Sequence, residues 1–102
     1  MPLTDKYISQ SKAIAARVLG DEAVIMSTVD SAVFMLNPTA TAIWKAADGT
    51  RPLSRIIEQD VCSEFDVTVE TASADATSLV EELAGHGLLL LSDTPIAHKE
   101  TP

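Results

Sequence analysis

The fold of this chain is decided by the stretch LNPTATAIW at residues 36–44, which the turn signal Asp48-Gly49 follows. Asn37 is a good helix N-cap, and Pro38 suits the first helical position because its missing N–H would be unpaired there anyway. The buried face of this helix is expected to carry Ala40, Ile43, Trp44 and Ala47, at the i, i+3, i+4, i+7 spacing. The stretch contains no reactive side chain, so it favours a structural module over a catalyst.

Length and composition indicate one globular domain. The chain has 102 residues, of which 46% are hydrophobic and 22% charged. Its single cysteine, Cys62, excludes an intrachain disulfide and fits a reducing compartment. The sequence shows neither a signal peptide nor an apolar run long enough to span a bilayer, so we expect a cytoplasmic protein without a membrane partner.

Three short strands are expected before the first helix. Residues 13–19 and 22–28 have strand character and flank the turn signal Gly20-Asp21, and residues 32–36 form a third apolar run after Asp30-Ser31. Residues 1–12 are polar and aperiodic, which predicts a flexible arm. Three consecutive strands predict a small antiparallel meander, whose edge strands would leave backbone N–H and C=O groups unpaired.

Three helices are expected to follow the meander. After the capped helix, apolar residues recur every fourth position from Leu53 to Phe65 and predict a second helix. The third is expected from Ala72 to Gly85 with Thr71 as its cap, after which residues 88–91 return to the core. Residues 92–102 are expected to be a flexible tail. The predicted fold is α+β and winged-helix-like, with residues 13–91 forming the domain.

The charge is unevenly distributed. The formal net charge is −8, and every Lys and Arg except Lys99 lies at or before Arg55. Residues 56–98 carry acidic side chains and no basic ones. Because nucleic-acid affinity depends mainly on Lys and Arg neutralising phosphates, this half of the chain argues against DNA or RNA as a partner.

The chemically active side chains form no recognisable catalytic set. Cys62 is expected to be a half-buried small hydrophobe, and neither His86 nor His98 has a metal-ligand neighbour at i+3 or i+4. Glu81 and Glu82 point about 100° apart on a helix, so they cannot share one substrate bond. The sequence therefore predicts no enzyme, no catalytic residue, no metal and no cofactor. Asp75 is either a surface carboxylate or a contact at the rim of a peptide-binding site.

Three segments together resemble the PqqD-like family. They are the Leu36-Asn37 strand end leading to Trp44, the turn Asp48-Gly49-Thr50-Arg51, and a last helix with Asp75-Ala76 followed by apolar pairs and Gly87-Leu88. Each motif is weak alone, but all three occur in the family's order and spacing. The resemblance covers residues 13–91.

The resemblance implies a peptide chaperone, also called a RiPP recognition element. Such a module binds the leader segment of a ribosomally made precursor peptide and presents it to a modifying enzyme, often a radical-SAM protein. The leader adds as a strand beside the third helix. Carried onto this sequence, the peptide-binding residues are Ser31, Ala32, Val33, Phe34, Met35, Leu36, Ala72, Asp75, Ala76 and Leu79. Alternation along the strand is expected to turn Phe34 toward the core and Val33 and Met35 away from it.

One difference from the family concerns residues 28–32. The PQQ-pathway members tend to carry a Pro-Glu-Arg-like segment before the first helix, where this chain has TVDSA. This difference favours a peptide-modification pathway other than PQQ synthesis. The alternatives are a winged-helix DNA-binding regulator and a purely structural subunit of a modifying enzyme. The open edge strand also allows a weak homodimer.

We predict that the protein does not bind nucleic acid, because residues 56–98 lack basic side chains. Fluorescence anisotropy with a labelled DNA duplex at low salt provides the most sensitive measurement, since electrostatic attraction is least screened there. No binding is expected at micromolar protein. A salt-sensitive micromolar isotherm would instead support the DNA-binding regulator.

Overall fold

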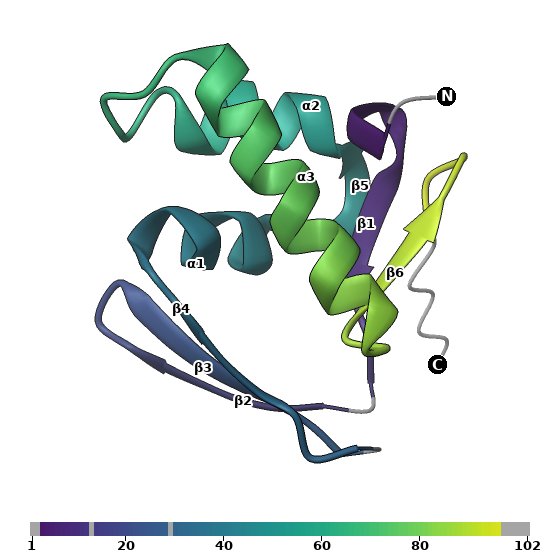
Figure 1. Ribbon diagram of the computed structural model, residues 1–102. Helices are drawn as coiled ribbons and strands as arrows, with labels where there is room; N and C mark the ends of the chain where they lie inside the picture. Colours follow the sequence, from purple (N-terminus) through teal and green to yellow (C-terminus); the bar gives the residue numbers. More distant parts are fainter. Residues whose placement is uncertain (1–2, 13, 29, 97–102) are drawn as a thin grey trace.

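The computed structural model describes residues 3–12, 14–28 and 30–96, and within them the chain forms an α+β fold with two small antiparallel sheets (Figure 1). The first sheet is the predicted meander, ordered β2 (Ile14–Leu19), β3 (Glu22–Ser27), β4 (Val33–Leu36). In β3, Ala23, Ile25 and Ser27 are buried, whereas the alternate residues are more exposed. This period of two is the reason the sequence forms a half-buried strand here.

The second sheet was not expected from the sequence. It has the order β5 (Asp48–Pro52), β1 (Tyr7–Gln10), β6 (Leu89–Ser92), with β1 antiparallel to both neighbours. The prediction of a flexible arm over residues 1–12 is therefore wrong for β1, where Ile8 is fully buried. A 3₁₀ turn, η1 (Leu3–Asp5), precedes this strand. The strand is stabilised by partners about 40 and 80 residues away, which local sequence patterns do not reveal.

The strands β5 and β6 include residues that the sequence pattern placed in a turn and in the tail. Asp48-Gly49 ends the helix as expected, with Gly49 at φ +82°, but it also begins β5. Ser92, expected in the tail, belongs to β6, and the Ile96 N–H donates to the Gly49 carbonyl at 2.9 Å. Residues 97–102 of the predicted tail lie outside the described residues. Of the run expected to return to the core, residues 88 and 89 are buried, whereas Leu90 and Leu91 are exposed.

The helix α1 (Pro38–Ala46) follows the sequence prediction closely. The Asn37 side chain accepts a hydrogen bond from the Ala40 N–H at 2.8 Å, which satisfies one of the free donors at the helix start. Trp44 is only 2% exposed and lies in the main core cluster. The expected burial of the Trp44 side chain is confirmed.

The second helix is shorter than the sequence pattern predicted. A single α-helical turn, α2 (Leu53–Ile56), widens into a π-helical turn, η2 (Ile57–Val61). The Cys62 N–H donates to the carbonyl of Ile57, five residues back, which marks the wider turn. The helix ends there, and Phe65 lies beyond it in the loop. Cys62 itself is half-buried, as expected.

The third helix, α3 (Val69–Gly85), begins three residues earlier than predicted. Thr68 is its N-cap and accepts from the Thr71 N–H at 3.2 Å, so Thr71 is inside the helix and is not its cap. The two hydroxyl groups also bond to one another at 3.1 Å. Four residues of α3 form its buried stripe: Ala72, Ala76, Val80 and Leu83.

A bidentate ion pair fixes β5 against η2. The Arg51 guanidinium donates to both carboxylate oxygens of Asp60, at 3.1 and 2.9 Å, and to Gln59 at 2.9 Å. This hydrogen-bonded carboxylate raises the pKa of Arg51. The fork geometry of a guanidinium allows the two parallel hydrogen bonds. The pair gives the arginine after Asp48-Gly49 a structural role.

The helices α1 and α3 lie between the two sheets, and α2 lies next to β5. Figure 1 shows α3 crossing the molecule diagonally, with α1 and the meander on one side and the β5–β1–β6 sheet on the other. Both sheets and all three helices contribute to one buried cluster. The meander therefore projects from the body with β4 near α1 and α3.

We predict that Trp44→Ala lowers the free energy of unfolding by about 3–5 kcal/mol, because it removes a buried large aromatic side chain. Chemical denaturation measures this loss. Met35→Ala is the control: its side chain is 82% exposed, and surface truncations usually change stability by less than about 0.5 kcal/mol. Equal stability of the two variants would contradict the core role of Trp44.

Candidate functional site

The strand β4 has one open backbone edge. It pairs with β3 on one side and ends the sheet on the other. The Ser27 N–H donates to the Ala32 carbonyl, which makes this the hydrogen-bonded pair that closes the β3–β4 hairpin. Because such pairs alternate in an antiparallel sheet, Phe34 and Leu36 also direct their backbone groups to β3. The N–H and C=O groups of Val33 and Met35 therefore point toward the open edge.

A groove of about 370 Å³ lies beside this edge, between β4, α1 and α3. Its lining combines apolar side chains with a few polar groups at the rim. The lining residues are Phe34, Met35, Leu36, Asn37, Thr39, Ala40, Ile43, Val67, Ala72, Asp75, Ser78, Leu79 and Glu82. An apolar hollow with few polar groups is the usual character of a ligand-binding site.

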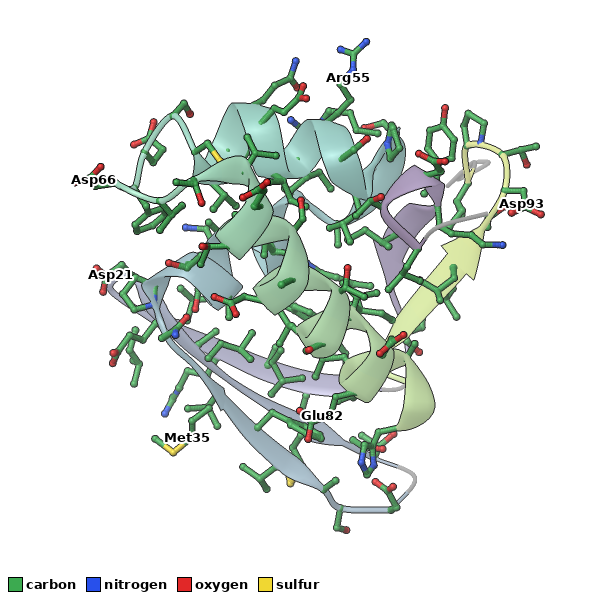
Figure 2. The ribbon with its side chains drawn as sticks, turned by 45° about the horizontal axis from the view of Figure 1, so that its top comes forward. Asp21, Met35, Arg55, Asp66, Glu82 and Asp93 are labelled. Carbon is green, nitrogen blue, oxygen red and sulfur yellow. The ribbon has the colours of Figure 1, made fainter. Side chains whose placement is uncertain are left out.

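One face of α3 forms a wall of the groove. Asp75, Leu79 and Glu82 recur at helical spacing, so they lie on one side of the helix next to its buried stripe. In Figure 2, Glu82 lies on the part of α3 that is over the meander. Packing of the buried stripe thus fixes where the groove wall stands.

Most of the predicted site residues come together in this groove. It is lined by six of them: Phe34, Met35, Leu36, Ala72, Asp75 and Leu79. Val33 is 57% exposed and belongs to the open edge, and Ser31 and Ala32 belong to the hairpin end of β4 without lining the groove. Ala76 is fully buried in the core and does not line the groove, and its contact with a peptide stays a prediction.

Several lining residues were missed by the sequence reasoning. Ser78 and Glu82 could have been found, because they stand three and seven residues after Asp75 on the same helix face. The contributions of α1 and of Val67 depend on how α1 and α3 pack, and no local signal predicts them.

The turn of the β3–β4 hairpin is attached to the end of α3. The Nδ1 atom of His86 lies 3.0 Å from Oδ2 of Asp30, and the His86 ring meets the Phe34 ring edge-on with centroids 5.0 Å apart. The other oxygen of Asp30 accepts from the Ala32 N–H at 3.1 Å. These hydrogen bonds, with that to His86 first, lower the pKa of Asp30 to about 2. Ser31 beside it has φ +60°, in the left-handed region.

The groove contains no group arranged for covalent chemistry among the described residues. Cys62 does not line it, and Glu81 lies outside its lining. Within residues 3–12, 14–28 and 30–96, no three His, Cys, Asp or Glu side chains are grouped to hold a metal ion. No helix in the same ranges is long and apolar enough to cross a membrane. The groove offers apolar side chains next to the open backbone edge of β4.

A second hollow of about 500 Å³ lies between α1, β5 and η2. It is larger than the groove, but its charged lining includes Arg51 and Asp60, which already bind one another. The strand β5, which lines it, also ends a sheet, but half of the lining residues are charged, so an added strand would find less apolar surface there. The groove beside β4 is therefore the better candidate site.

One family model and one solved structure are similar to this chain. The family model for coenzyme PQQ synthesis protein D (PqqD) matches residues 22–89. A solved structure, TbiB1 in complex with the TbiA(beta) leader peptide, is similar with a TM-score of 0.69 and 23% sequence identity, covering 79% of this chain and 93% of that one. The likeness establishes a common fold. No curated protein matches the sequence closely enough to count as a relative.

We predict that the contact between Asp30 and His86 is lost as the pH falls from about 4 toward 2. The pKa of Asp30 is lowered from 3.8 to about 2 in the folded protein, so the unfolded chain binds more protons in this interval. The stabilisation is therefore complete above about pH 4 and is lost progressively as the pH falls to about 2. An NMR pH titration of the Ala32 amide and the His86 ring is expected to show a transition near pH 2. Asp30→Asn should abolish that transition, whereas an ordinary midpoint near pH 4 would contradict the contact.

Proposed function

The chain belongs to the PqqD family, and from this premise we propose that it is a non-catalytic chaperone for a precursor peptide. It binds an extended leader segment by strand addition to β4 and presents that segment to a modifying enzyme. The resemblance favours a radical-SAM protein as that enzyme and the cytoplasm, where precursors are synthesised, as the location. The difference at residues 28–32 favours a pathway other than PQQ synthesis.

The open edge of β4 beside an apolar groove is the observation that carries this proposal. An added strand would pair with the outward N–H and C=O groups of Val33 and Met35, and its alternate side chains would enter the groove. Backbone pairing provides affinity for any extended peptide, and the groove selects among side chains. TbiB1, which shares the fold, was solved in complex with a leader peptide, and this supports an occupant of the same class here.

The other edge of the meander is a weaker candidate. Five of the six residues of β2 are exposed, so a peptide added there would gain backbone hydrogen bonds but few side-chain contacts. At β4, α3 stands alongside and supplies those contacts. The weak homodimer through an edge strand stays a prediction.

The two alternative functions make different use of this surface. A DNA-binding regulator would insert a basic recognition helix into the major groove, but α3 carries Glu70, Asp75, Glu81 and Glu82 and neither Lys nor Arg. A purely structural subunit would have no need of an open edge beside an apolar groove. Peptide binding accounts for both features.

We predict that Met35→Pro weakens peptide binding about three- to tenfold, because it removes one outward backbone donor from β4. The probe is a 12-residue peptide selected for binding from a randomised mRNA-displayed library, and the measurement is fluorescence anisotropy. Val18→Pro is the matched control. Its N–H points outward from the other edge strand by the same alternation, so binding should be unchanged.

An amide chemical-shift map with the same peptide locates the binding surface. Shifts are expected in residues 31–36 and along α3. Shifts centred on η2 or β5, with β4 unaffected, would contradict strand addition and move the site to another part of the chain.

A further inference from the structure

Two carboxylates line the α3 wall of the groove, and no Lys or Arg of the described residues lines it with them. Asp75 and Glu82 are exposed and stand seven residues apart, which places them on one helix face about 10 Å apart along the axis. Among the described residues, neither forms a hydrogen bond or an ion pair with another side chain. The helix wall is therefore an uncompensated negative surface.

The surface between the two carboxylates is apolar. Leu79 lies between them in the helix and is half-buried, and Phe34 and Leu36 line the groove from the opposite strand. A peptide side chain that enters the groove next to Leu79 would be surrounded by hydrocarbon groups and shielded from water. Affinity there would come from the burial of apolar surface.

The arrangement matches the spacing of an extended peptide. Side chains on one face of a strand repeat every two residues, or about 6.8 Å. If an apolar side chain enters beside Leu79, the neighbours on the same face lie close to Asp75 and Glu82. The flexible stem of a Lys or Arg can cover the remaining few ångströms.

Resting on the proposed function, we propose that the occupant is a basic–apolar–basic segment. An apolar residue enters the groove, and Lys or Arg two residues away on the same face, on one or both sides, meets Asp75 or Glu82. These two carboxylates determine specificity and have no catalytic role. They also repel an acidic segment, so the groove discriminates by both attraction and repulsion.

The net charge of −8 would attract any basic peptide weakly, so local recognition must be separated from this general field. Glu81 provides the comparison. It is exposed on the same helix but points about 100° away from Glu82 and does not line the groove. Glu58 on η2 is a second exposed carboxylate that does not line the groove. Asp75→Asn with Glu82→Gln and Glu58→Gln with Glu81→Gln change the net charge by the same amount.

The experiment selects binders from a randomised 12-residue mRNA-displayed library against the wild type and both double variants. With the wild type we expect enrichment of Lys or Arg two residues from an apolar position. The enrichment is expected to persist with the Glu58/Glu81 variant and to disappear with the Asp75/Glu82 variant. Replacing one enriched Lys by Gln should weaken wild-type binding about two- to fivefold, as expected for an exposed ion pair. This difference should shrink at 1 M salt.

The outcomes separate this inference from the function on which it rests. Selected peptides that shift β4 resonances but show no basic preference would leave strand addition intact and overturn the charge selectivity. A basic preference lost equally in both double variants would also overturn it, because the general field would then be the cause. Two outcomes would overturn the proposed function together with this inference. One is a set of selected peptides that shift only amide resonances far from β4; the other is a library that yields no binder to the wild type.

Discussion

The packing of the buried stripe of α3 is the constraint on which the rest of the structure depends. Ala76, Val80 and Leu83 are fully buried in the core cluster. The small side chain of Ala76 lets the helix backbone approach its neighbours closely. Because a helix is rigid, fixing this stripe also fixes the adjacent stripe of Asp75, Leu79 and Glu82, which forms the wall of the groove. Core packing thus sets where the wall of the groove lies.

An open strand edge is a hazard for a protein, because any extended chain can pair with it. Here β4 is short, with four residues, and α3 stands beside its open side. The hairpin that carries β4 is attached to the end of α3 through Asp30 and His86. The edge of β4 is already ordered in the folded protein. Binding of an added strand would therefore not include the entropic cost of ordering β4. The short length of β4 and the position of α3 beside it restrict unwanted pairing, and they can also provide selectivity among the strands that pair with β4.

The local elements were largely predictable from the sequence. The Asn37-Pro38 start of α1, the alternation in β3 and the apolar run of β4 each carry a complete signal within a few residues. The limits of the later helices were less predictable. Thr68 and Thr71 are equally good caps by composition, and the π-helical turn that ends at Val61 follows from packing that a repeat of apolar residues does not report.

In the candidate site, too, some residues were predictable from the sequence and others depend on how the helices pack. The resemblance to the family and the strand alternation identified the β4 part of the groove and its partners Asp75 and Leu79 on α3. They did not identify Ile43 or Val67, which reach the groove only because α1 and α3 pack as they do. Ala76 was expected both in the buried stripe and at the peptide; it is fully buried, one step of 100° around the helix from Asp75, which lines the groove.

The sequence by itself determined the meander, the capped α1, the acidic character of α3 and the family, since each depends on residues close together or on composition. Only the tertiary structure decided the β5–β1–β6 sheet, the Arg51–Asp60 ion pair between β5 and η2, and the contact of His86 with Asp30 at the hairpin turn. The strands of that sheet begin at residues 7, 48 and 89, and the two residues of the hairpin contact are 56 positions apart. A short strand of mixed polarity has little preference of its own, so its structure comes from the partners that the folded core brings to it.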